Sequence, residues 1–174
     1  MHHIDEGEIR GWFTGRIPSG WFVSPLQITS DREELLVIGT LADVDVAQDA
    51  SAAEREAARN SRTEAFREET RQARVLIAED AEQRFGRKVS WGIKIGDVER
   101  HFTTLSVPVM TRLRMRERAT LDTLVDSGVA RSRSEALAWC VRLVGEHQGD
   151  WIAKLREALG AVEAVRGEGP APSR

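Results

Sequence analysis

The sequence predicts an α+β protein with a larger N-terminal domain and a small C-terminal helical module. Two stretches, 20–41 and 88–107, combine β-branched and aromatic residues with turn signals, which is the pattern of β-hairpins. The stretch between them is rich in Ala, Glu and Arg and repeats apolar residues at helical spacing. The last third holds short amphipathic segments behind one cationic run. With 174 residues, the chain is long enough to bury a core of ordinary size.

The N-terminal domain is expected over residues 1–107, with two hairpins and one long helix. The first hairpin consists of WFVSPLQIT, the turn-prone SDREE and LLVIGTL, and Pro25 places its first strand at an edge or a bulge. Residues 51–85 contain neither proline nor glycine and predict a single long amphipathic helix. Gly86 follows where a left-handed cap would end it. The run KVSWGIKI, the dipeptide GD and VERHFTTLSV predict the second hairpin.

The C-terminal module is expected over residues 108–147. It begins with an extended run and continues with a helix over 117–126 that ends at a Ser-Gly pair. A second helix is predicted to begin at Ser132. Ser132 and Glu135 have the S-x-x-E spacing of a capping box, in which each side chain binds a backbone amide at the helix start.

A last helix is expected over residues 148–166, followed by a tail over 167–174 with the composition of a disordered segment. Asp150 is predicted to cap this helix. Its apolar stripe consists of Ile152, Leu155, Leu159 and Val162. The helix either extends a dimer core or packs back on the N-terminal domain.

Composition excludes several classes of protein. Cys140 is the one cysteine, so no intramolecular disulfide can form, and a reducing compartment is expected. No apolar run approaches the roughly 20 residues of a membrane span, and the first residues lack the apolar core of an export signal. We therefore expect a cytoplasmic protein without membrane association. Cys140 lies on an apolar helical stripe, where a small packing residue is expected rather than a nucleophile.

Charge is distributed unevenly along the chain. The net charge of −3 and the pI of 5.9 disfavour indiscriminate binding to nucleic acid. Residues 1–107 carry 14 basic and 19 acidic groups, whereas residues 108–147 carry 7 basic and 5 acidic groups. Within the basic part, arginines fall on alternate positions: Arg112, Arg114, Arg116 and Arg118. This pattern marks the segment as a candidate nucleic-acid contact.

The cationic run predicts a β-strand with two different faces. The period of two places Val109, Thr111, Leu113 and Met115 on an apolar face. The opposite face carries Met110, Arg112, Arg114 and Arg116. A single short strand needs a partner, and the simplest partner is the same strand of a second copy. The resulting ribbon fits the DNA major groove, where Arg112 and Arg114 would bind guanine. The alternative is a helix that begins near Met110 and exposes its arginines to solvent.

Two helices after this strand supply a core and an anchor. Leu121, Leu124 and Val125 form the apolar side of the first helix, and the second contributes Leu137, Cys140, Val141 and Val144. Four such helices from two chains would share one dimer core, to which Leu113 also contributes. The start of the second helix offers free amides and two guanidiniums to DNA phosphate. The expected phosphate contacts are Arg116, Arg131, Ser132, Arg133 and Ser134.

Residues 109–147 resemble the ribbon-helix-helix repressors. The most specific stretch is LDTLVDSGVARSRSEAL, which has the Leu-Asp and Leu-Val of that family's first helix, its Ser-Gly bend and its Ser-Arg-Ser-Glu-Ala helix start. The resemblance implies an intertwined dimer with a β-ribbon in the major groove. It places Met110, Arg112 and Arg114 at the base-reading positions and Ser132–Ser134 at the phosphate-anchoring helix start. It also implies two dimers side by side on adjacent DNA half-sites.

No motif predicts catalysis, a metal site or a cofactor. We therefore expect a non-enzymatic, sequence-specific regulator of transcription that binds double-stranded DNA as a homodimer. The N-terminal domain would sense a small effector, bind a protein partner or build oligomers. The alternative is a dimeric interaction or scaffold protein, including an antitoxin-like partner-binding protein, whose helices dimerise without touching DNA.

Overall fold

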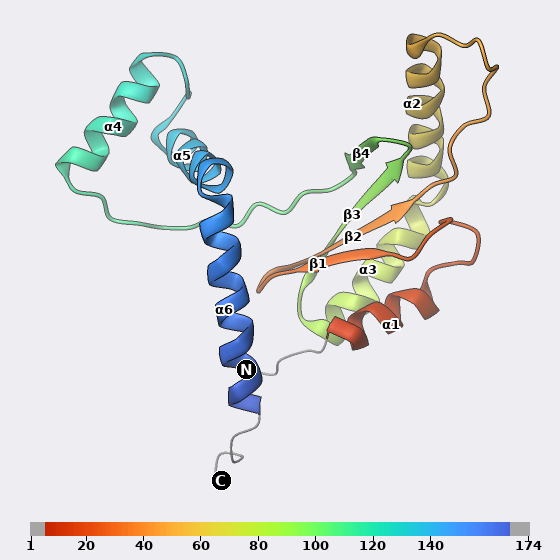
Figure 1. The fold of residues 1–174 in the computed structure, drawn as a ribbon, viewed down its shortest axis with the longest axis horizontal. Coiled ribbons are helices and arrows are strands. Elements are labelled where there is room, and N and C mark those ends of the chain that lie inside the picture. The colour runs from red at the N-terminus through yellow and green to blue at the C-terminus, as the bar shows by residue number, and fades with distance from the viewer. Residues whose placement is uncertain (1–5, 168–174) are drawn as a thin grey trace. The chain divides into compact units, whose positions relative to one another are not determined.

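The computed structural model describes residues 6–167, which form two compact units that divide between Pro108 and Val109 (Figure 1). The N-terminal unit contains α1 (Glu6–Arg16), β1 (Gln27–Ser30), β2 (Glu34–Thr40), α2 (Ala52–Glu69), α3 (Arg71–Phe85), β3 (Lys88–Ile95) and β4 (Val98–His101). The C-terminal unit contains α4 (Met115–Asp126), α5 (Arg133–His147) and α6 (Gly149–Gly167). The chain is therefore of mixed α+β class, as predicted. Among the described residues, no helix is both long and apolar enough to cross a membrane. The tail predicted over 168–174 lies outside the described residues.

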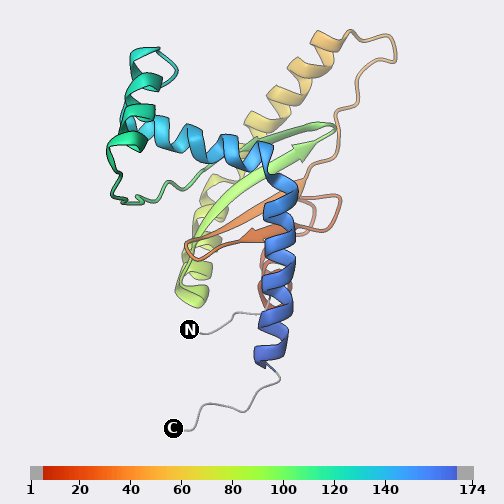
Figure 2. The ribbon, with the colours of Figure 1, turned by 60° about the vertical axis from the view of Figure 1, so that its left-hand side comes forward.

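The N-terminal unit is built on a four-stranded sheet in the order β1-β2-β3-β4. Both predicted hairpins are confirmed, because β1 pairs antiparallel with β2 and β3 pairs antiparallel with β4. The two hairpins are joined by a parallel pairing of β2 with β3, in which Val37 lies opposite Trp91. Parallel neighbours need a crossover connection, and α2 and α3 provide it (Figure 2).

The single long helix predicted over residues 51–85 is wrong, because the chain breaks into α2 and α3 at Thr70. The Thr70 hydroxyl donates to the Phe66 carbonyl at 2.6 Å, a local bond that competes with regular helix geometry. Arg74 then donates from Nε to Thr70 Oγ1 at 3.0 Å and from Nη2 to the Arg67 carbonyl at 2.8 Å. These bonds satisfy the end of α2. The predicted cap at Gly86 is confirmed, with a φ of 66°.

Two apolar clusters form the core of this unit. The first joins Ile9 and Phe13 of α1 to the α3 residues Ile77, Ala81 and Phe85 and to Leu35, Val37 and Trp91 of the sheet. The second contains Leu41, Phe66, Ile93 and Ile95. The break at Thr70 lets α2 serve the second cluster while α3 serves the first. Helix α1 had no counterpart in the sequence prediction.

Gly39 lies where the second cluster presses most closely on the sheet. A Cβ atom at this position would lie 2.3 Å from the Phe22 ring, which packs with Trp21 and Phe66. We expect Gly39→Ala to lower the free energy of unfolding of this unit by about 1–3 kcal/mol, because the ring must move within a packed aromatic cluster. Chemical denaturation of the full chain measures this loss.

The matched control is Gly11→Ala. An added Cβ at Gly11 meets nothing within 4 Å, and the residue lies in α1. Alanine should there raise stability by roughly 0.5–1 kcal/mol through its higher helix propensity. Equal effects of the two substitutions would contradict the proposed packing of Phe22.

Candidate nucleic-acid interface

The cationic segment enters the structure as extended chain without regular secondary structure. Residues 103–114 form neither helix nor strand, and α4 begins at Met115. The alternative of a helix that starts near Met110 is therefore wrong. The predicted strand is not formed within one chain, and Met115, expected on its apolar face, belongs to α4. The Glu117 carboxylate accepts the Arg114 N–H, and Arg118 donates to the Leu113 carbonyl at 2.6 Å, so the extended chain ends there.

The side chains of this segment separate into one anchored residue and exposed neighbours. Leu113 is half-buried and packs on the core between α4 and α5. Arg112 and Arg114 on either side of it are exposed, as is Arg116. Within residues 6–167, none of these three guanidiniums has a carboxylate partner among the ion pairs. Met110 is 97% exposed. The predicted base-reading residues thus share one exposed segment.

The core of the C-terminal unit is small. Its fully buried residues are Leu121, Ala130 and Ala136. Five predicted dimer-core residues participate, since Leu121 belongs to this core and the following pack on it: Leu113, Leu124, Leu137 and Cys140. The other two, Val141 and Val144, are exposed on α5. Only part of the predicted core is therefore closed within one chain.

An open groove of about 330 Å³ connects the extended segment with both helices. Met110 and Leu113 line one side of it, and Leu137 of α5 lines the other. Arg133 and Ser134 lie at the same groove. One residue expected to read bases and two expected to hold phosphate are thereby brought together.

The start of α5 follows the prediction in part. Ser132 is the N-cap residue, and its hydroxyl accepts the Glu135 N–H at 3.2 Å. The reciprocal half of the capping box is wrong, because the Glu135 carboxylate accepts the Arg131 N–H at 2.8 Å instead of the Ser132 N–H. The carboxylate is drawn there by the Arg131 guanidinium, which lies 3.2 Å away.

Both arginines expected at DNA phosphate already have carboxylate partners. Arg133 donates to both carboxylate oxygens of Asp122 on α4, at 2.6 and 2.8 Å. Hydrogen bonding from Arg133 holds the pKa of Asp122 below its ordinary value, and Arg131 lowers the pKa of Glu135 in the same way. Asp122 and Arg133 are eleven positions apart on different helices, so no local spacing in the sequence indicates their pairing.

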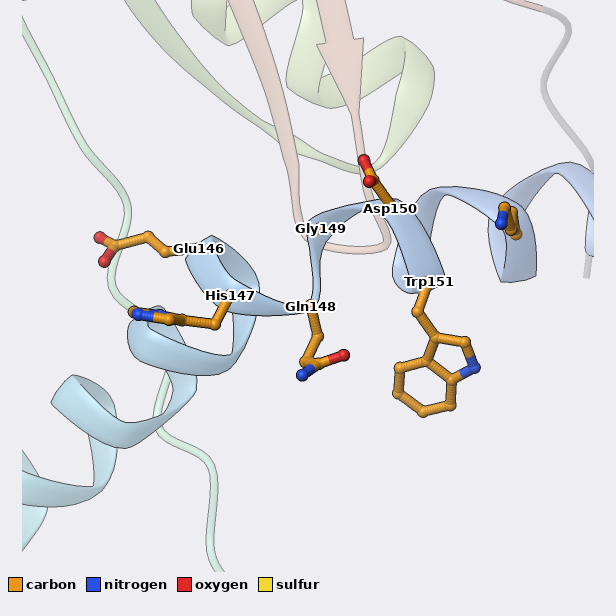
Figure 3. Close-up of a pocket in the computed structure, with 7 residues that line it drawn as sticks. Glu146, His147, Gln148, Gly149, Asp150 and Trp151 are labelled. Atoms are coloured by element: carbon orange, nitrogen blue, oxygen red, sulfur yellow. The ribbon is translucent and has the colours of Figure 1, made fainter.

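The junction of α5 and α6 encloses a second hollow, of about 390 Å³ (Figure 3). The prediction that Asp150 caps α6 is wrong, since α6 begins at Gly149 and Asp150 lies in its first turn. Asp150 points to the opposite side from Gln148 and Trp151, so the lining side chains do not converge (Figure 3). Among the described residues, no cluster of three His, Cys, Asp or Glu side chains suits a metal ion. This hollow carries no recognisable chemistry.

Comparison with known proteins identifies relatives along most of the chain. Residues 7–101 match the family described as Rv1265-like protein, N-terminal domain, and residues 114–166 match the Mb1296 C-terminal domain. The chain is 54% identical over 159 residues to the uncharacterized protein Mb1296 of Mycobacterium bovis. It is equally similar to the uncharacterized proteins MT1303 and Rv1265 from two strains of Mycobacterium tuberculosis. Each match covers 91% of this chain and 69% of the relative. No solved structure matches it.

The pairing of Asp122 with Arg133 predicts a dependence of stability on pH. The folded-state pKa of Asp122 lies below its ordinary value. The pair therefore stabilises the fold fully above about pH 4, and this contribution is lost as the pH falls through the lowered pKa. In Arg133→Ala, the Asp122 carboxyl should titrate near an ordinary aspartate value, and stability should fall less steeply with acid. NMR titration of the carboxyl carbon measures this, with Arg142→Ala on the same helix as the control.

Proposed function

The chain belongs to the Rv1265-like protein family, and we propose that it is a homodimeric, sequence-specific DNA-binding regulator of transcription. Residues 109–114 of two copies would pair as an antiparallel β-ribbon in the major groove. Helices α4 and α5 of both copies would form the core beneath the ribbon, in the ribbon-helix-helix arrangement. The N-terminal unit would respond to a small effector or a protein partner.

The observation that carries this proposal is the state of the segment around Leu113. Leu113 is held by the core, while Arg112 and Arg114 extend into solvent without carboxylate partners in the described part of the chain. The backbone of residues 109–112 makes no backbone hydrogen bond to any described residue. An extended segment with unpaired amides and carbonyls is ready to pair with another strand. The same pairing would aim both guanidiniums outward at base edges.

The start of α5 supports the proposal in a secondary way. Ser132 caps the helix, and the positive end of the helix dipole lies beside Arg131, Arg133 and Ser134. Phosphate there would exchange with the carboxylates of Asp122 and Glu135. Such contacts would fix the register of the protein on DNA while the ribbon selects the sequence.

The same ion pairs favour a second candidate function. An α5 start whose arginines are neutralised by carboxylates is also suited to a helical module that binds protein and not DNA. In that case the C-terminal unit would only dimerise, and the N-terminal unit would carry the interaction. Salt dependence separates the two candidates, because neutralisation of phosphates makes log affinity fall linearly with log salt concentration.

The ribbon assignment predicts a specific loss from Arg112→Ala and from Arg114→Ala. Each should weaken binding to a DNA site selected by the wild-type chain from a random library by about 10- to 150-fold, because a bidentate guanine contact is worth about 1–3 kcal/mol. The dimer should remain folded. Fluorescence anisotropy with labelled DNA measures the affinity.

Arg142→Ala is the matched control, because Arg142 is exposed on α5 and lies outside the proposed interface. Its DNA affinity should equal that of the wild type. Unaltered affinity in Arg112→Ala and Arg114→Ala would remove the ribbon assignment. Failure of the wild-type chain to select any DNA at low salt would favour the interaction protein.

The phosphate assignment predicts opposite effects on the two sides of the Arg133–Asp122 pair. Arg133→Ala should weaken binding to all sequences alike and reduce the slope of log affinity against log salt by about 1. Asp122→Asn frees the guanidinium and should tighten binding to all sequences, with a steeper slope. Affinities measured from 50 to 300 mM salt on selected and scrambled DNA test both. A change of sequence preference alone in Arg133→Ala would mean that Arg133 reads bases.

A further inference from the structure

The C-terminal unit exposes far more apolar surface than it buries. Three residues form its buried core. Twelve large hydrophobic side chains between Val109 and Val165 are exposed, from 36% for Leu143 to 97% for Met110. The N-terminal unit exposes only five such side chains and buries most of its apolar residues. A single chain therefore leaves the C-terminal unit incompletely covered.

The largest part of this surface lies on α6. The sequence-predicted stripe is largely uncovered, since Leu155, Leu159 and Val162 are exposed and Ile152 is half-buried. Exposed residues on this helix also follow a second pattern, with alternating steps of four and three positions. They are Trp151, Leu155, Ala158, Val162 and Val165. This 3.5-residue average is the spacing of a coiled-coil seam, in which a helix packs along another helix of the same pattern.

We infer that α6 pairs with α6 of a second copy of this chain through this seam. Among the described helices, α6 has the seam spacing while leaving its apolar face exposed. A second copy brings an identical seam, so the two faces match in length and spacing. The small side chain of Ala158 in the middle lets two such helices approach closely.

The area of the surface also points to a second copy. A stable interface covers roughly 800 Å² on each partner. Two heptads of one helix supply only part of this area, and short isolated helices are marginal in water. The exposed Val141 and Val144 of α5 supply more, and they belong to the face that the proposed dimer would cover. The inference rests on the proposed function for this continuity, and α6 would extend the same dimer beyond the ribbon and α5.

The test measures the oligomeric state of the full chain without DNA. Sedimentation equilibrium compares the wild type with Leu155→Asp/Val162→Asp, which places carboxylates in the seam. We expect the dimer dissociation constant to rise by roughly 100-fold or more, because two apolar contacts per chain are lost and charge is buried. The matched control is Ala153→Asp/Ala164→Asp, which adds the same charge to exposed positions on the opposite face of α6. The control should dimerise more tightly than the seam variant.

Far-UV circular dichroism checks that α6 remains helical. If the aspartates unfold it, Leu155→Ala/Val162→Ala keeps helix propensity high and should still weaken the dimer by at least tenfold. A monomeric wild type at 100 μM, on the order of a weak dimer's range, would overturn the inference. Equal dissociation constants for the seam and control variants would also overturn it, and would assign α6 to its own N-terminal unit. Loss of DNA binding with an intact α6-dependent dimer would overturn only the proposed function.

Discussion

Leu121, Ala130 and Ala136 are the residues that the described part of the C-terminal unit buries completely, and how little they cover constrains everything else in this unit. Burial of apolar area is the main favourable term in folding, and two of these three side chains are single methyl groups. Leu113, Leu124, Leu137 and Cys140 close the core only partly. The apolar faces of α5 and α6 thus have more to gain from association than from anything within the unit. The C-terminal unit is best understood as half of a larger core.

The arginines of the C-terminal unit fall into two electrostatic classes. Arg131 and Arg133 are held by carboxylates, so their charges are compensated at the surface. Arg112, Arg114 and Arg116 are exposed and have no such partner among the described residues. An uncompensated row of cations on an extended segment repels itself and favours a polyanion, whereas a compensated pair must first exchange its carboxylate. The free row is therefore the stronger argument for DNA, and the paired helix start is secondary.

Local chemistry made much of the fold predictable from sequence. The hairpins, the left-handed cap at Gly86 and the N-cap at Ser132 depend on residues a few positions apart, and all three were predicted. The break at Thr70 was missed because the flanking sequence has uninterrupted helix formers, and only the bonds of Thr70 and Arg74 reveal it. Pairings across long separations gave no signal either. Arg59 joins Asp43 at 2.7 Å to Asp97 at 2.6 Å, and Arg133 joins Asp122 across two helices. The arginine row of the site was visible in the sequence, and its compensation by acids was not.

The contrast between the two units bears on how they divide the work of the protein. The N-terminal unit closes two apolar clusters around its sheet with α1, α2 and α3, so its fold does not require another chain. A unit that is complete by itself can change its state on binding an effector without losing its fold. The C-terminal unit gains its missing core from association, so its stability depends on protomer concentration. An effector that acts on the first unit would then alter DNA binding only by shifting the assembly of the second. This coupling locates regulation in the equilibrium between single and paired chains.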